Sequence, residues 1–185
     1  MSTTATTTAI RTKWALDPSH SELAFKVKHL MISNVKGEFQ KFNASIEAVG
    51  TDLSHARVHA TMDATSIFTN DENRDKHLRG ADFFDTEKHP SLEFNGTAME
   101  HMSGFDYKLT GDLTIKGITK PVTLDVEFGG TNIDPWGNEK MAFSLNGKID
   151  RKAWGLNWNS ALEKGGVLVS DEVRITAELQ FVNKA

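Results

Sequence analysis

The dominant pattern along this chain is an alternation of apolar and polar residues with a period of two, which begins at Lys13. Such alternation indicates strands that bury one face. The clearest run is VTLDVEF at 122–128, in which every second residue is apolar. Comparable runs occupy 14–17, 22–29, 35–47, 56–63, 92–98, 105–115, 141–145 and 173–181. The intervening turns are short, so the pattern predicts an antiparallel meander of eight or nine long strands, with one helical turn at 29–33.

Long, twisted strands in that number tend to curl and close, which removes exposed sheet edges. The chain is therefore predicted to be all-β, an antiparallel up-and-down β-barrel of about eight strands. Glycines within the strand patterns mark positions of bending or close approach: Gly96, Gly111 and Gly147. The predicted inner faces are rich in phenylalanine: Phe25, Phe39, Phe94, Phe105, Phe128, Phe143 and Phe181. Periodicity alone leaves open whether these rings fill the barrel or line a hollow.

One stretch, TNDENRDKHLRGADFFD at 69–85, departs from the strand pattern. Thr69 and Glu72 have the spacing of a capping box, and Gly80 is placed to end a helix in a left-handed conformation. The sequence thus predicts one short helix, about 70–79, near the barrel mouth. Asp75 and Arg79 have the spacing of a surface ion pair.

Leu78 is the only sizeable apolar residue within this predicted helix, so the helix cannot bury a core by itself. The adjacent aromatic residues Phe83 and Phe84 follow it and require an apolar partner elsewhere. We therefore interpret the segment as a lid on the strands.

Length, composition and charge exclude several classes of protein. The 185 residues suit one domain, with residues 1–12 as a flexible Thr-rich tail and 13–185 as the barrel domain. The net charge of −4, with both signs interspersed, favours neither nucleic acid nor attraction to anionic lipid. No run of about 18 apolar residues occurs, so no spanning helix is predicted. The first residues lack the apolar core of a secretion signal, which favours a cytoplasmic location.

Candidate catalytic chemistry is sparse. The chain has no cysteine, and its seven histidines do not form a metal-binding motif; His55 and His59 lie about 13 Å apart along a strand. No nucleophile motif or phosphate loop occurs. Nearby carboxylates are interpreted as surface charges and turn formers: Asp82 with Asp85, and Asp134 with Glu139. The sequence therefore predicts neither a metal site, a cofactor nor catalytic residues.

Two arginines and a tryptophan-rich stretch are candidates for a binding role. Arg74, with Asp75 beside it in the helix, and Arg151 beyond the 141–145 strand either anchor the polar head of an amphiphile or belong to an ordinary ion-pair network around the helix. The stretch WGLNW at 154–158 has no strand rhythm, and tryptophans outside strands need a packing partner or a ligand. They either line a barrel mouth or plug one end of the core.

Four longer stretches together resemble the YceI-like family. They are DPSHSELAFKVKHLMISNVKGEF at 17–39, TNDENRDKHLRGADFFDTEKHPSLEF at 69–94, LTGDLTIKGITKPVTLDVEFGG at 109–130 and IDRKAWGL at 149–156. The resemblance implies an extended lipocalin-like barrel with a helix at its mouth, an elongated apolar cavity for a long isoprenoid or other fatty amphiphile, and a homodimer. It also implies that the helix at 74–78 and the turn at 83–84 border the cavity. Many members carry a secretion signal, whereas this sequence has only the Thr-rich tail. The resemblance therefore implies a lipid-binding role in the cytoplasm for this sequence.

The expected function is binding, storage or transport of such a lipid. The predicted ligand-binding residues are Phe25, Val27, His29, Phe39, Met62, Arg74, Leu78, Phe84, Phe94, Leu113, Phe143 and Trp154. Two alternatives stay open at this stage. One is an enzyme acting on a lipidic substrate in the same cavity, for which His29 is the inward-facing titratable group. The other is a stress-related structural protein with a filled core.

Overall fold

The computed structural model of the protein describes residues 10–184. Most of the predicted flexible tail therefore lies outside the described residues. Within its described part, Arg11 Nη1 donates hydrogen bonds to the carbonyl oxygens of Glu47 and His55. The first strand begins at Thr12, one residue before the predicted start of the barrel domain.

Residues 10–184 form eleven strands, one α-helix and three short 3-10 helices. The strands are β1 (Thr12–Leu16), β2 (Glu22–His29), β3 (Ser33–Phe39), β4 (Phe42–Val49), β5 (Asp52–Asp63), β6 (Ile67–Phe68), β7 (Ser91–Ser103), β8 (Asp106–Ile115), β9 (Ile118–Ile133), β10 (Glu139–Asp150) and β11 (Val169–Asn183). The helices are η1 (Pro18–His20), η2 (Ala64–Ser66), α1 (Glu72–Arg79) and η3 (Arg151–Trp154).

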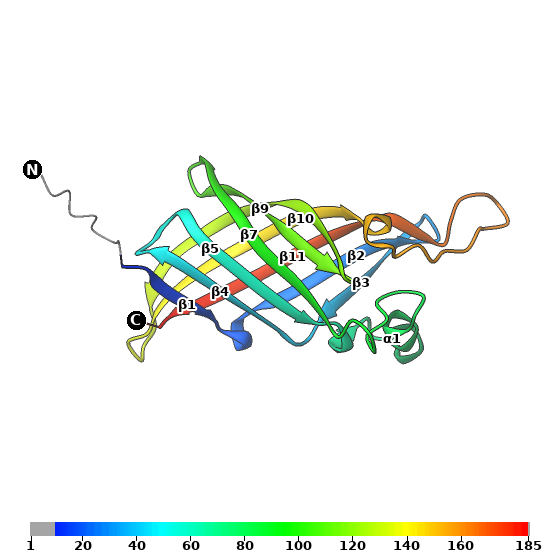
Figure 1. The fold of residues 1–185 in the computed structure, drawn as a ribbon, viewed down its shortest axis with the longest axis horizontal. Helices are drawn as coiled ribbons and strands as arrows, with labels where there is room; N and C mark the ends of the chain where they lie inside the picture. The colour runs from blue at the N-terminus through cyan, green and yellow to red at the C-terminus, as the bar shows by residue number, and fades with distance from the viewer. Residues whose placement is uncertain (1–9, 185) are drawn as a thin grey trace, which may run out of the picture.

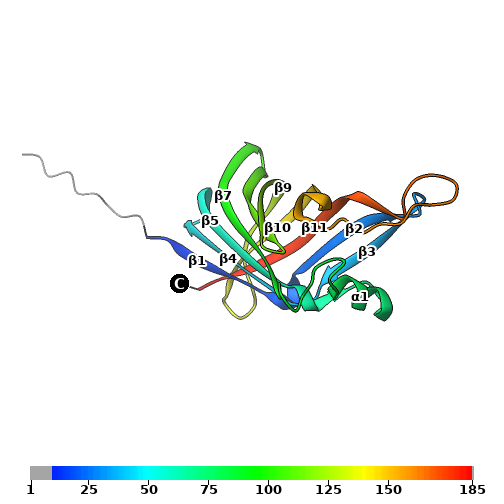
Figure 2. The same cartoon turned by 45° about the vertical axis from the view of Figure 1, so that its right-hand side comes forward.

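The strands close into a barrel, as Figures 1 and 2 show. Each strand pairs antiparallel with its neighbour in the order β1-β4-β5-β7-β8-β9-β10-β11, and β1 pairs with β11 to complete the ring. β2 continues the path of β1, and β3 leads into β4, so two of the long strands are interrupted strands. The prediction of an all-β, antiparallel, eight-stranded up-and-down barrel with one helix is confirmed.

The interruptions in the first two long strands open one half of the barrel. Pro18 has no N–H for a strand ladder, and the Asp17 side chain accepts from Ser19 N at 3.1 Å, so η1 replaces the strand there. Beyond this break, the free edge of β3 pairs only with β6, over Phe39 and one neighbour. The segment between β5 and β7, which carries α1, covers the gap that β3 leaves (Figure 2).

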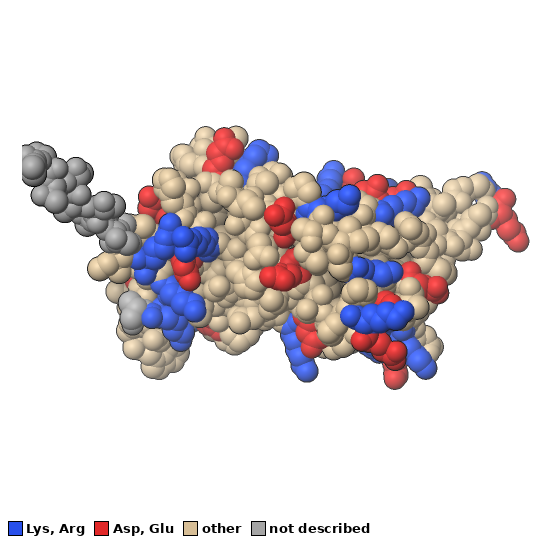
Figure 3. Space-filling view, viewed as in Figure 1, with Lys and Arg blue, Asp and Glu red and all other residues tan. Residues whose placement is uncertain are grey.

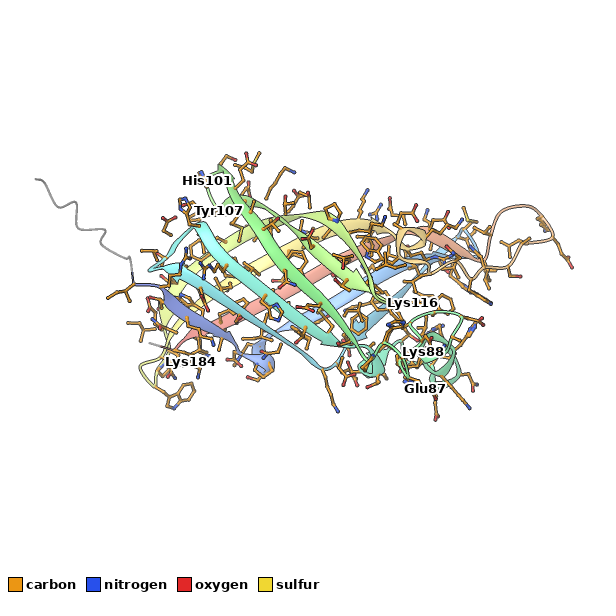
Figure 4. The ribbon with its side chains drawn as sticks, in the orientation of Figure 1. Glu87, Lys88, His101, Tyr107, Lys116 and Lys184 are labelled. Atoms are coloured by element: carbon orange, nitrogen blue, oxygen red, sulfur yellow. The ribbon has the colours of Figure 1, made fainter. Side chains whose placement is uncertain are left out.

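The other half of the barrel is a densely packed core. The side chains of Trp14, Leu53, Met141 and Phe181 are each about 1% exposed and belong to one hydrophobic cluster. Outside this core, Lys140 Nζ lies 2.7 Å from Asp17 Oδ2, and this ion pair joins β10 to the end of β1. Figure 4 places the labelled Lys184 at the end of the barrel far from α1.

Glycines inside the strands permit close approach, as predicted. A Cβ on Gly111 would lie 2.4 Å from Phe94 Cζ, and one on Gly147 would lie 2.3 Å from Leu124 Cδ2. Side chains at these positions would occupy the space of rings and branches that pack across neighbouring strands.

Two predictions about the strands and their turns are wrong. Residues 29–33 do not form a helical turn: they form the β2–β3 hairpin, with Ile32 N donating to His29 O at 3.2 Å. Phe105 does not belong to the inner face, because it lies in the β7–β8 turn with 66% of its surface exposed. Periodicity extends a strand pattern into a turn because it contains no information about where the chain reverses.

Candidate functional site: an apolar cavity beneath the helical lid

The open half of the barrel encloses a cavity of about 560 Å³. Nearly all of its lining side chains are aliphatic or aromatic, and its polar lining residues belong to the mouth. A volume of this size falls in the range of pockets that hold one small molecule, about 300–1,000 Å³. The hollow therefore answers the question that periodicity left open: the rings of Phe25, Phe94 and Phe143 line a cavity and do not fill the barrel.

Alternate residues of the long strands build the wall. On β11, Val173, Ile175, Ala177, Leu179 and Phe181 face the cavity. The lining continues to Val169, so it follows β11 over residues 169–181, about 40 Å of strand. Because the wall is long and the volume moderate, the hollow is elongated and suits a chain-shaped ligand better than a round one.

Eleven of the twelve predicted ligand-binding residues lie on the cavity wall: Phe25, Val27, His29, Phe39, Met62, Arg74, Leu78, Phe84, Phe94, Leu113 and Phe143. Their contact with a ligand remains a prediction. Trp154 is the exception, because its ring is buried outside the lining and its Nε1 donates to Leu113 O at 2.9 Å. The two interpretations of the 154–158 stretch therefore apply to different residues. Trp154 is packed in the core, and Trp158 lines the cavity.

The lining also includes residues that the sequence analysis did not select. Most of them are aliphatic, such as Val58 and Leu109, and occupy the same period-two faces as the selected phenylalanines. Selection by aromatic content therefore missed them, although the alternation itself identifies them. Trp158 and His77 were recognisable only as residues near the predicted lid and mouth.

The lid is joined to the barrel by aromatic contacts. The Phe84 ring packs edge-on against Phe39, with centroids 5.9 Å apart, and Phe39 in turn packs against Phe25. Phe83 and Trp158 lie 5.4 Å apart, and both rings contact His77 of α1. These contacts supply the apolar partners that the two adjacent phenylalanines require, and they close one side of the cavity.

The loop after α1 extends the lid toward the β8–β9 turn. Figure 4 shows Lys116 of that turn close to the loop that carries Glu87 and Lys88. A Cβ on Gly117 would lie 3.5 Å from His89 Cε1, which is ordinary contact distance. The lid is therefore supported from both the β3 side and the β8–β9 side.

The local structure at the start of α1 differs from the predicted capping box. The N-cap is Asp71, whose carboxylate accepts from Arg74 N at 3.0 Å, so Thr69 does not cap the helix. Gly80 ends the helix with φ −75°, an extended and not a left-handed conformation. Asp75 is buried and accepts hydrogen bonds from the backbone N–H and the hydroxyl of Thr69, at 2.8 and 2.5 Å. The predicted Asp75–Arg79 ion pair is therefore wrong, because Asp75 points inward to the preceding turn.

Arg74 stands at the polar end of the cavity. Its Nε donates to Thr69 Oγ1 and its Nη2 to Thr69 O, both at 2.7 Å. Within the part of the chain that the structure describes, Nη1 has no protein partner. Asp71 and Asn73 line the same rim, so a head group there would meet one cation together with polar side chains.

Arg151 has a structural task at the cavity wall. Its buried guanidinium donates to the carbonyl oxygens of Ser170 at 2.9 Å, of Trp158 at 2.9 Å and of Leu156. Burial lowers the pKa of Arg151 from its usual value, and the carboxylate of Asp171, 3.8 Å from Nη2, opposes that shift. Because these acceptors occupy its donors, Arg151 fixes the 156–158 loop and leaves Arg74 as the better head-group candidate.

The titratable groups of the cavity lie at its mouth. His77 Nε2 lies 2.9 Å from Asp82 Oδ2, whereas His29 faces the cavity at the end of β2. In residues 10–184, no three His, Asp or Glu side chains are grouped as a metal site requires. Nor does any helix of that range combine the length and hydropathy needed to cross a bilayer.

A closed antiparallel barrel that keeps an apolar hollow under a helical lid belongs to the lipocalin-like class of barrels. More narrowly, this chain belongs to the YceI-like family, whose domain model matches residues 14–181. It is 41% identical to the UPF0312 protein SA2479 of Staphylococcus aureus (strain N315) over 171 residues, 92% of this chain and 97% of that protein.

Solved structures share the fold. BcnA of Burkholderia cenocepacia matches with a TM-score of 0.77 and 26% identity, over 89% of this chain and 98% of that one. The YCEI protein of Campylobacter jejuni matches with a TM-score of 0.73 and 34% identity, over 85% and 90%. A polyisoprenoid binding domain from Saccharophagus degradans, implicated in plant cell wall breakdown, matches with a TM-score of 0.66 at 15% identity, over 92% and 98%. At that identity the last comparison shows the fold alone.

Proposed function

We propose that this protein binds, stores or transports one isoprenoid-type or other long-chain amphiphilic lipid, with the chain in the barrel cavity and the head at the α1 rim. The observation that carries the proposal is the division of the lining: a long apolar wall with its polar groups at one end. An amphiphile has the same division. A neighbour that shares this fold, from Saccharophagus degradans, is a polyisoprenoid binding domain.

The energetics favour a long chain. Removing apolar surface from water contributes about 25 cal/mol per Å², so burying roughly 300 Å² of hydrocarbon contributes about 7.5 kcal/mol before the entropy of association is subtracted. Each additional buried methylene adds about 0.8 kcal/mol until the chain fills the hollow. Affinity should therefore rise with chain length and then level off.

A binding protein fits the polar groups better than an enzyme does. Arg74 and His77 already make hydrogen bonds within the lid, and Arg151 holds a loop. His29 remains the residue on which the enzymatic alternative depends. The substitution His29→Ala should leave lipid uptake intact, with no turnover of a lipidic substrate to lose. Turnover by the wild type that the variant loses while its uptake stays intact would favour the enzyme instead. The alternative of a filled core is disfavoured by the cavity itself.

Mass spectrometry of organic extracts from the purified protein tests the proposal directly. A stoichiometric lipid, or uptake of added geranylgeraniol by delipidated protein, is the expected result. Repeated absence of any extracted lipid, together with no uptake of geranylgeraniol or of quinone analogues, would contradict it.

Two further expectations accompany the proposal. We expect a homodimer, which light scattering coupled to size-exclusion chromatography measures, and a monomeric mass would refute it. A cytoplasmic location likewise stays a prediction, which fractionation of the producing cells would check.

A further inference from the structure

The tip of the β2–β3 hairpin presents three consecutive apolar side chains to solvent. Leu30, Met31 and Ile32 are 40%, 49% and 83% exposed. Scattered exposed apolar residues are ordinary, but three consecutive ones on a projecting tip form an apolar patch of the kind that marks an interaction site. We call residues 30–32 the apolar tip.

The backbone of the apolar tip is one that large side chains disfavour. Leu30 and Met31 have φ of 54° and 61°, and Ile32 N donates to His29 O, as in a type I′ turn. Such turns favour Asn-Gly, because side chains beyond Asn and Asp are strained at positive φ. Two bulky apolar residues at these positions therefore destabilise the turn. Residues that are unfavourable for their local backbone conformation tend to occur at functional sites.

The apolar tip borders the mouth of the cavity. His29, the residue before it, lines the cavity, as do Leu168 and Val169 of the adjoining chain. Leu30 N donates to Leu168 O at 2.9 Å, which ties the tip to that wall. Figures 1 and 2 show the β2–β3 hairpin and the 155–168 loop projecting at the end of the barrel that carries α1.

A row of cations crosses the outer face of the sheet behind the tip. The strand registers place Lys148 opposite Arg174, Arg174 opposite Lys26, and Lys26 opposite Lys36. Like charges directly opposite one another destabilise a sheet. Glu172 lies 3.3 Å from Arg174 and 3.9 Å from Lys148, and Glu22 lies 2.7 Å from Lys36. Among the described residues, Lys26 is thus the member of this cationic row without a carboxylate within 4.0 Å. Exposed Lys28 stands between the row and the tip.

We propose that the apolar tip and the cationic row dock the protein on an anionic phospholipid bilayer, with the cavity mouth turned toward the membrane. This inference rests on the proposed function, because it supplies the route by which a lipid would pass between bilayer and cavity. Apolar side chains enter the interface and basic side chains attract anionic head groups in peripheral membrane proteins.

The spacing suits that arrangement. Lys26 is four residues from Leu30, about 13 Å along β2, and Lys28 is about 7 Å away. With the tip inserted 5–10 Å, Lys28 reaches the head groups and the row lies close to one screening length from them. The whole chain has a charge of −4, and Figure 3 shows both signs mixed over the face that it draws, so the attraction is local.

The opposite end of the barrel is a poorer membrane contact. Ile133 and Trp136 are exposed in the β9–β10 hairpin, but they are separated from each other and stand beside Asp134 and Glu139. Two residues separate Ile133 from Trp136, so no three consecutive apolar side chains are exposed there as they are at the apolar tip. Ile133 therefore provides a control position with the same side chain and similar exposure at the other end.

Sedimentation with vesicles of equal parts phosphatidylglycerol and phosphatidylcholine measures docking. The wild-type protein should bind them and bind phosphatidylcholine vesicles more weakly. Ile32→Asp should weaken partitioning about tenfold or more, whereas Ile133→Asp should change it less than twofold. Lys26→Glu should weaken it about fivefold, although the new carboxylate would relieve repulsion in the sheet and leave thermal stability unchanged or higher. Equal effects of the two Ile→Asp substitutions, or no vesicle binding by the wild type, would overturn the proposal.

A turn exchange separates docking from folding. The double change Leu30→Asn with Met31→Gly provides the sequence that a type I′ turn favours. We expect an unchanged or higher midpoint of thermal unfolding and at least tenfold weaker vesicle partitioning. A lower midpoint with unchanged partitioning would assign the tip to fold stability and refute docking.

Geranylgeraniol delivery distinguishes failure of docking from failure of the proposed function. Supplied from cyclodextrin, it should load the wild type and Ile32→Asp equally; supplied from the vesicles, it should load Ile32→Asp at least tenfold more slowly. Equal loading from vesicles would refute docking and leave lipid binding standing. Loading of neither protein from either source would refute the proposed function, and vesicle sedimentation alone would then decide whether the tip docks.

Discussion

Replacing Ala44 by phenylalanine should fill part of the cavity and separate lipid binding from stability. Ala44 lies on the cavity wall in β4, and the residue directly across the strand pair is another alanine, Ala60. The added ring would therefore enter the hollow without meeting a large side chain from its neighbour. Most substitutions in a packed core destabilise, so a gain in stability here would be a distinctive result.

The expected magnitude follows from the cavity. A phenyl group in place of one hydrogen of the alanine methyl fills roughly 100 Å³ of the 560 Å³. At about 24 cal/mol per Å³ of cavity removed, the upper estimate of stabilisation is about 2.4 kcal/mol. Because the ring loses rotamer freedom and fits imperfectly, we expect a gain of about 1–2 kcal/mol in the free energy of unfolding of delipidated Ala44→Phe, measured by urea denaturation. Geranylgeraniol should raise the unfolding midpoint of the wild type and leave that of the variant almost unchanged.

The matched control is the same change four residues further along the same face of β4. Ala48 is fully buried and does not line the cavity. Ala48→Phe should lower the free energy of unfolding by about 1–3 kcal/mol through overpacking. If Ala44→Phe destabilises as much as Ala48→Phe, the hollow is already occupied by the protein's own side chains. If Ala44→Phe keeps the full lipid-induced shift, the lipid binds elsewhere.

Other substitutions test the supports of the barrel. Arg151→Met should lower the free energy of unfolding in urea by about 3 kcal/mol or more, because several buried carbonyls lose their donor; a loss below 1 kcal/mol would contradict the structural role. The hydrogen bond from Lys140 holds the pKa of Asp17 well below its usual range. The ionised Asp17 carboxylate therefore stabilises the folded protein above about pH 4, and this contribution is lost as pH falls. Asp17→Asn should therefore cost about 1.5–3 kcal/mol at pH 7 and progressively less below pH 4 in urea titrations; a cost independent of pH would refute the charge argument. Gly111→Ala should lower the thermal midpoint, because its Cβ would lie 2.4 Å from Phe94 Cζ, at a cost of about 1–3 kcal/mol; an unchanged midpoint would show that the Phe94 ring moves aside freely.

The alternation of residues along the chain carried most of the information on the fold. A period of two assigns each side chain to one face of a strand, and short turns join each strand to the next. These local facts are enough for a closed meander, and they placed Phe25 and Phe143 on the inner wall. Local signals were less reliable where several residues compete for one role, as at Thr69 and Asp71, either of which has the side chain of an N-cap.

The sequence by itself determined that the barrel closes, which faces turn inward and that the 69–85 segment lies over the strands as a lid. Only the tertiary structure decided that a cavity remains inside the barrel, that Trp158 and not Trp154 lines it, and that the apolar tip stands beside its mouth. The physical reason is that periodicity describes each strand separately. Empty space, by contrast, is what remains after side chains from all the strands, far apart in sequence, have met across the barrel.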